Sequence, residues 1–203
     1  MAGQAGKQPG CQGLVEQVRF KCTLKLLSPH QALEQQLCEW LDVEAALLFN
    51  SGFAANQALC MALFSKHARA FDNKLHANIF ADKLMHASFL EGAMCVSDNA
   101  QLRRFKHNDT EHLSSLLQKG ANSDTLIVSE GVFSMDGDCA PSEEIAEIAQ
   151  QHNSWFMLDD AHGIGVLGDN GFGTIEALGL TQAKVPIVMG TFGKAVGTAG
   201  AFI

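Results

Sequence analysis

Short, continuous apolar runs alternate along this chain with segments of helical periodicity. The clearest runs are T-L-I-V-S at 125–129, W-F-M-L at 155–158 and I-V-M at 187–189. A strand that is apolar at every position, rather than at every second one, is typically buried on both faces. Buried strands separated by helices predict an α/β fold, in which a mainly parallel sheet is flanked by helices.

Helix and strand signals are placed around these runs. Ser28 and Pro29 favour a helix start, and Leu33, Leu37 and Trp40 then follow at helical spacing. Further helices are expected at 53–64, 86–94, 110–119 and 141–152, and further strands at 45–49, 79–82 and 199–203.

Composition narrows the function classes. The 203 residues contain 14 Lys and Arg against 22 Asp and Glu, a net charge of −8, which argues against nucleic-acid and membrane partners. No apolar stretch is long enough to span a bilayer or to act as a signal peptide, so a cytoplasmic location is expected. The six cysteines are scattered and the eight histidines lack ligand spacing. We therefore expect no disulfide and no metal site, and we expect the cysteines to be small buried residues.

In such a fold, functional side chains gather beyond the carboxyl ends of the strands. Asp159 follows a buried run directly, so its carboxylate needs a cation or several donors. Lys194 lies in a loop of small apolar residues, where desolvation lowers an amine pKa and favours Schiff-base chemistry. Pyridoxal phosphate requires this pair of groups. The alternative to a cofactor site is a purely structural role, in which Asp159 caps a helix, His162 lies in the core and Lys194 is an ordinary surface lysine.

The glycines of G-x-G-x-x-G at 163–168 could instead indicate a dinucleotide site. That site needs a helix that starts at the glycines and an acid about 20 residues later. Turn-forming residues follow at 169–173, and Glu176 comes too early to be that acid. The glycines are therefore expected to form a tight loop.

Seven motifs in order give the chain a resemblance to a known family. They are H-Q-A-L-E-Q-Q-L at 30–37, L-F-N-S-G-F-A-A-N-Q-A at 48–58, H-A-S-F-L-E at 86–91, Q-L-R-R-F-K-H-N-D at 101–109, S-E-G-V-F-S-M-D-G-D at 129–138, D-D-A-H-G-I-G-V-L-G at 159–168 and T-F-G-K-A-V-G-T-A-G at 191–200. Over 29–203 the chain resembles the α-oxoamine synthases, which are fold-type-I pyridoxal-phosphate enzymes.

The resemblance implies a set of catalytic and cofactor-binding residues. Lys194 would carry the cofactor as a Schiff base, Asp159 would keep the pyridine nitrogen protonated, and His86 would stack on the ring. His162 and Ser134 would contact the ring hydroxyl of the cofactor. The phosphate would be bound by Thr191, Gly52 and Phe53.

The implied activity is the condensation of L-alanine with a pimeloyl thioester, with loss of carbon dioxide, in biotin biosynthesis. The acyl carrier would be coenzyme A or an acyl carrier protein, and the whole enzyme a homodimer. A sister activity, glycine C-acetyltransferase or 5-aminolevulinate synthase, stays open, as does a non-catalytic truncated remnant.

Three departures from the family pattern bear on domain organisation. Residues 1–28 diverge from it and are expected to be poorly ordered, and 67–78 resemble an insertion. The chain stops nine residues after Lys194, at Ile203. Residues 29–203 are therefore expected to be part of the large cofactor-binding domain, without the C-terminal domain: a fragment.

Overall fold

The computed structural model of the chain describes residues 28–65, 77–119 and 124–203. The expectations for 1–27, for Cys11 and Cys22, and for most of the 67–78 segment lie outside these residues. Within the described part, no helix is long and apolar enough to cross a membrane.

Seven strands of the described residues form one sheet, in the order β1-β7-β6-β5-β4-β2-β3. Neighbours from β6 to β3 pair in parallel, whereas β7 is antiparallel to both β6 and β1. This confirms the predicted mainly parallel sheet. The strands are β1 Leu48–Phe49, β2 Ala77–Asp82, β3 Ala100–Phe105, β4 Thr125–Glu130, β5 Trp155–Asp159, β6 Ile187–Thr191 and β7 Ala201–Phe202.

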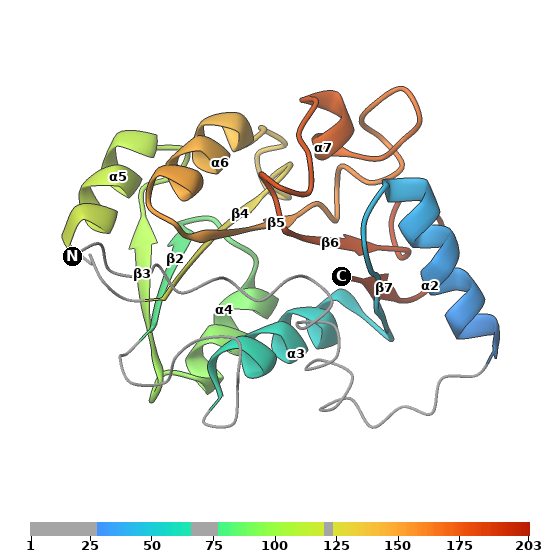
Figure 1. Cartoon of the computed structure of the whole chain (residues 1–203), viewed down its shortest axis with the longest axis horizontal. Coiled ribbons are helices and arrows are strands. Elements are labelled where there is room, and N and C mark those ends of the chain that lie inside the picture. Colours follow the sequence, from blue (N-terminus) through green and yellow to red (C-terminus); the bar gives the residue numbers. More distant parts are fainter. Residues whose placement is uncertain (1–27, 66–76, 120–123) are drawn as a thin grey trace, which may run out of the picture.

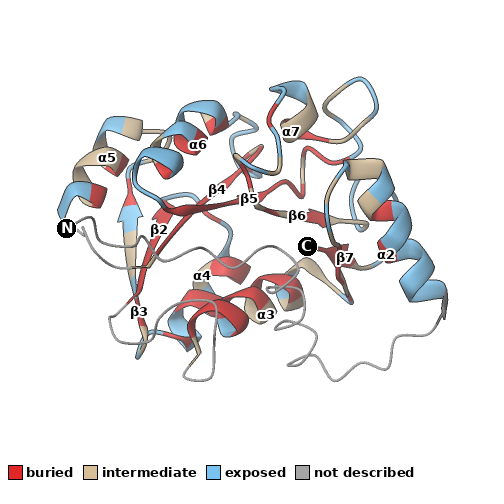
Figure 2. Cartoon of the chain, in the orientation of Figure 1, coloured by how far each residue is buried: buried red, intermediate tan, exposed pale blue. Residues whose placement is uncertain are grey.

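Helices cover both faces of the sheet (Figure 1). They are α2 Ser28–Leu41, α3 Gly52–Phe64, α4 Ala87–Cys95, α5 Thr110–Lys119, α6 Ser142–Gln151 and α7 Thr174–Ala177. α3 and α4 pack on one face and α5 and α6 on the other, and each pair contributes to a separate apolar core. In Figure 2 the central strands are buried, while the helices are exposed on their outer sides.

Strand β5 shows how the two faces divide. Trp155 and Met157 belong to the core under α3 and α4, whereas Phe156 and Leu158 belong to the core under α5 and α6. Successive side chains of a strand point to opposite faces. The same alternation directs the carboxylate at the end of β5 towards α3 and α4, which is the geometry on which the site depends.

Two elements and some of the cysteines differ from expectation. β3 was not predicted because it is an edge strand with polar, partly exposed middle positions, so it lacks the continuous apolar run. α7 is too short to give a periodic signal. Cys60 is buried as expected, but the expectation was wrong for Cys95 and Cys139, which are exposed at a helix end and in a loop.

A histidine between two aspartates joins the end of β2 to the loop after β4. His107 Nδ1 lies 3.0 Å from Asp82 Oδ1, and its Nε2 lies 2.8 Å from Asp138 Oδ2. Asn108 reinforces both ends, because its backbone amide donates to Asp82 and its side chain donates to Asp138. Burial lowers the pKa of His107, but the hydrogen bonds and charges of the two aspartates outweigh it and raise the pKa above 6.5. We call this group the His107 clasp.

The His107 clasp gives a pH-dependent contribution to stability. Because the folded pKa is raised, the contribution is complete below pH 6.5 and is lost as the pH rises through the folded value. His107→Gln should lower the free energy of unfolding by about 1–2 kcal/mol near pH 5.5, and by less near pH 9. Urea unfolding at both pH values measures this difference. A loss of equal size at the two pH values would contradict a charged His107.

Candidate active site

The candidate site lies where parallel strands end at one edge of the sheet. Glu130, the last residue of β4, is in register with Asp159, the last residue of β5, and Asp159 is in register with Met189 of β6. Thr191 ends β6 at the same edge, three residues before Lys194. The structure therefore brings together the strand ends that the sequence singled out.

Asp159 is almost fully buried, with 4% of its surface exposed. Its Oδ2 accepts a hydrogen bond from Asn56 Nδ2 of α3 at 3.2 Å, and its Oδ1 accepts one from the backbone amide of Ala161 at 3.2 Å. Burial raises the pKa of Asp159, while these two donors and the positive charge of Lys194 act in the opposite direction. The carboxylate thus has the donors that a buried charge requires.

Lys194 reaches back to the loop after β5. Its Nζ lies 2.8 Å from Nε2 of His162. Desolvation lowers the pKa of Lys194, although the negative charges of Asp159 and Glu130 oppose this shift. Desolvation and the neighbouring lysine lower the pKa of His162 as well, so its neutral Nε2 can accept a proton of the amine. Two predicted site residues therefore form a direct pair.

An apolar groove borders the loop that carries this lysine. Leu37 and Trp40 of α2 line one side, and Phe192 and Val196 line the other. Trp40 also packs edge-on against Phe172, with ring centroids 5.5 Å apart. Lys194 and the rest of its loop are exposed, so the small apolar surroundings expected from the sequence lie on the neighbouring groove and do not enclose the amine.

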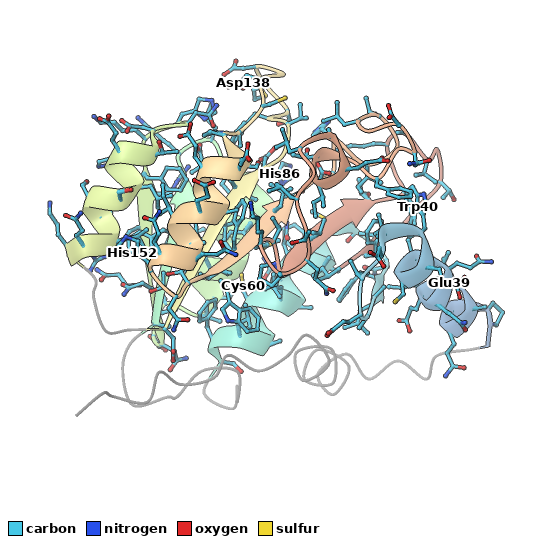
Figure 3. The ribbon with its side chains drawn as sticks, turned by 45° about the horizontal axis from the view of Figure 1, so that its top comes forward. Glu39, Trp40, Cys60, His86, Asp138 and His152 are labelled. Atoms are coloured by element: carbon cyan, nitrogen blue, oxygen red, sulfur yellow. The ribbon has the colours of Figure 1, made fainter. Side chains whose placement is uncertain are left out.

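His86 caps the start of α4 and is exposed. Its Nδ1 accepts from the backbone amide of Ser88 at 3.2 Å and lies 2.8 Å from the Ser88 hydroxyl. In Figure 3, His86 lies between the loop of Asp138 and the α3 residue Cys60. A polar ring at this position can face a planar ligand held over the strand ends.

Glu130 is a site residue to which the sequence analysis gave no role. It is 3% exposed, and Oε1 has no hydrogen-bond partner among the described residues. The backbone amides of His86 and Ser134 donate to its carboxyl group, but burial and then the charge of Asp159 raise its pKa to about 7. The signal that could have found it is the strand period: Leu126, Val128 and Glu130 share one face.

The three predicted phosphate-binding residues differ in whether their hydrogen-bonding groups already have partners. The Thr191 hydroxyl donates to the carbonyl of Gly200 at 3.0 Å and accepts from the amide of Gly193 at 3.1 Å, so it holds its own loop. The amides of Gly52 and Phe53 open α3 and have no acceptor within the described part of the chain. Free amides at a helix start suit an anion.

Asp160 points to the opposite face and is fully buried. It accepts from the amide of Thr174 at 2.7 Å and from the Thr174 hydroxyl at 2.6 Å, while burial raises its pKa to about 6. A Cβ added at Gly131, Gly163 or Gly173 would lie within 2.2 Å of a carboxylate oxygen. Residues 161–171 form turns and bends, which confirms the tight glycine loop, and the close approach of Asp160 explains Gly163 in it.

In 28–65, 77–119 and 124–203, no three His, Cys, Asp or Glu side chains are grouped so that they could hold a metal ion. The chemistry that the described site offers is that of a buried carboxylate, an amine of lowered pKa and two imidazoles.

Known proteins resemble this chain in sequence and structure. The family described as aminotransferase class I and II matches residues 21–203. An 8-amino-7-oxononanoate synthase of Salmonella paratyphi B is 52% identical over 174 residues, which are 86% of this chain and 42% of that protein. The chain thus spans about two fifths of the length of this curated relative.

Two solved structures share the fold. An 8-amino-7-oxononanoate synthase from Francisella tularensis has a TM-score of 0.71 and 31% identity, over 98% of this chain and 53% of its own. A serine palmitoyltransferase from S. paucimobilis, with a bound PLP–myriocin aldimine, has a TM-score of 0.77 and 30% identity over 97% and 49%.

The Asp160–Thr174 pair gives a prediction on stability. Because the folded carboxyl titrates near 6 instead of its ordinary 3.8, stability falls as the pH rises between these values. Thr174→Val removes the hydroxyl donor, so it should cost about 1.5–3 kcal/mol near pH 8 and less near pH 4. Urea unfolding of this variant and of Thr181→Val, an exposed control, measures the effect. Equal losses in the two variants would contradict it.

Proposed function

Because the chain belongs to the aminotransferase class I and II family, we propose that residues 29–203 form the cofactor-binding part of an 8-amino-7-oxononanoate synthase. This enzyme joins L-alanine to a pimeloyl thioester with loss of carbon dioxide, in biotin biosynthesis. The acyl group arrives on coenzyme A or on an acyl carrier protein, and the intact enzyme is a homodimer. The observation that carries the proposal is the buried carboxylate of Asp159 at the same strand edge as the pair formed by Lys194 and His162.

The site residues fit pyridoxal phosphate. Asp159 offers a buried acceptor for a protonated pyridine nitrogen, and the negative charge is worth more there than in water. The amides of Gly52 and Phe53 are free to receive the phosphate, and Lys194 offers an amine of lowered pKa. Bound to such a site, pyridoxal phosphate supplies an electron sink for the substrate α-carbon.

The remaining residues orient the ring. His162 and Ser134 would bond the ring hydroxyl, and His86, at the start of α4, would face the ring. Thr191 supports the phosphate end by fixing the loop before Lys194 through its bonds to Gly193 and Gly200. Together these groups would hold the ring at its edges and on one face, which favours a single orientation of the substrate.

Lys194 also moves a proton in the proposed reaction. Once substrate occupies the site, its free Nζ takes the proton from the α-carbon of L-alanine. Desolvation lowers the pKa of this amine, which increases the share of its unprotonated form that can act as a general base. His162 Nε2, which lies 2.8 Å from Lys194 Nζ, orients the amine by accepting a hydrogen bond from it.

The cofactor assignment is tested by reductive trapping. The 203-residue chain with pyridoxal phosphate should show a visible absorption band, and borohydride should fix the cofactor on the peptide that contains Lys194. Lys194→Ala should abolish trapping, since Lys194 is the lysine whose charge acts on Asp159, whereas the control Lys184→Ala should keep it. Mass spectrometry of the peptides reads the result. Trapping on Lys184 would contradict the assigned site.

The substrate assignment is tested on the full-length gene product. With pimeloyl-coenzyme A, L-alanine should be preferred over glycine by about tenfold or more in kcat/KM, because a pocket that fits one methyl group discriminates by this amount. Product formation with acetyl-coenzyme A or succinyl-coenzyme A and glycine, but not with L-alanine, would instead identify a sister activity.

A further inference from the structure

A chain of hydrogen bonds runs from Asp159 to His86 beneath the candidate site. Asn56 Nδ2 donates to Asp159 Oδ2 at 3.2 Å and to Ser88 Oγ at 2.9 Å. The Ser88 hydroxyl in turn lies 2.8 Å from His86 Nδ1. Asn56 is fully buried and Ser88 is 4% exposed, so solvent does not compete with these bonds.

Asp159 determines which atoms donate and which accept along this series of hydrogen bonds. An ionised carboxylate only accepts hydrogen bonds, so Asn56 must present its Nδ2 rather than its Oδ1 to it. The price of this orientation is visible, because Asn56 Oδ1 is buried without a partner among the described residues. A buried unpaired oxygen is costly, so the two bonds made by Nδ2 must outweigh that cost.

Ser88 passes this direction on to His86. The backbone amide of Ser88 donates to His86 Nδ1 at 3.2 Å, which makes this nitrogen an acceptor. The Ser88 hydroxyl, 2.8 Å from the same Nδ1, therefore donates its proton to it, while its oxygen accepts from Asn56. With two donors aimed at it, Nδ1 carries no proton, and the neutral imidazole holds its proton on Nε2.

We propose that Asn56 and Ser88 are positioning residues that hold the carboxylate of Asp159 and the ring of His86 as one unit. The inference rests on the proposed function, in which these two groups contact the same cofactor ring. The hydrogen bond from Asn56 favours the ionised form of Asp159 and aims its carboxylate at the pyridine nitrogen, while Ser88 fixes the tautomer and the tilt of His86. The spacing between the two contacts is thus set before the cofactor binds.

Simple packing of α3 against α4 is the alternative role for these residues, and Gln57 serves as the control for it. Its Nε2 donates to the backbone carbonyl of Ser88 at 3.2 Å, so it also joins α3 to α4 without touching Asp159. Gln57→Ala removes a bond between the same helices and leaves the Asn56–Ser88 chain intact.

The first measurement needs no cofactor. Imidazole nitrogen NMR of the ¹⁵N-labelled chain, with His86 assigned by its loss in His86→Gln, should show the Nε2–H tautomer. In Ser88→Ala the Nδ1 resonance should move towards that of a less hydrogen-bonded acceptor. In Asn56→Leu it should move less in the same direction, because the Ser88 hydroxyl loses the bond that orients it while the backbone amide of Ser88 still donates to Nδ1. Gln57→Ala should leave the spectrum unchanged. A proton on Nδ1 in the unaltered chain would overturn the proposal.

The second measurement is the Kd for pyridoxal phosphate, followed by its absorption. Ser88→Ala and Asn56→Leu should each weaken binding about tenfold, and Gln57→Ala less than about twofold. Equal losses in all three variants would overturn the proposal, and Ser88→Ala decides if Asn56→Leu does not fold. If the unaltered chain shows the expected tautomer but binds no cofactor, the proposed function fails while the Asn56–Ser88 chain stands.

Discussion

Two consecutive carboxylates at the end of β5 have to be satisfied on opposite faces of the sheet. Burying a charge is expensive unless donors or a cation are supplied, and the strand period allows the two side chains no common partner. Asp159 is therefore served by Asn56 of α3, and Asp160 by Thr174 at the start of α7. Much of the local architecture answers this requirement: a polar side chain within an apolar helix on one face, and a glycine-lined loop leading to a short helix on the other.

The third carboxylate of this edge, Glu130, changes the charge balance. It lies beside Asp159 in the sheet, and burial together with that neighbour raises its pKa to about 7. Near neutral pH the Glu130 carboxyl group is therefore only partly ionised. This reduces the negative charge that faces Lys194. Since its folded pKa lies above the ordinary 4.5, its ionisation costs stability between these two values. A site that ionises at such a cost is typical of functional rather than structural design.

The sequence predicts features that depend on neighbouring residues, and it does not predict those that depend on contacts between residues far apart along the chain. Asp159 and Lys194 stand next to buried strands, and their surroundings can be inferred from neighbouring residues, so the sequence alone singles both out as candidates. Asn56 was missed because its partner lies 103 residues away, and within its own helix it is one polar residue among alanines and leucines. The edge strand β3 was missed for a related reason. Its polar pattern becomes a strand only through pairing with β2, which is a tertiary contact and leaves no local signal.

The structure shows that part of the acidic composition is buried at the ends of the strands and does not lie on the surface. A net charge of −8 was interpreted as a property of the surface, yet Asp82, Glu130, Asp159 and Asp160 are all buried. Each ends a strand or directly follows one, so they line the edge at which parallel strands finish. The loop between residues 131 and 140 is fastened by them at both ends: Gly131 packs against Asp160, and Asp138 meets Asp82 through the His107 clasp. Acids that composition assigns to solvation thus set the shape of the site, because each one forces a donor into a fixed position.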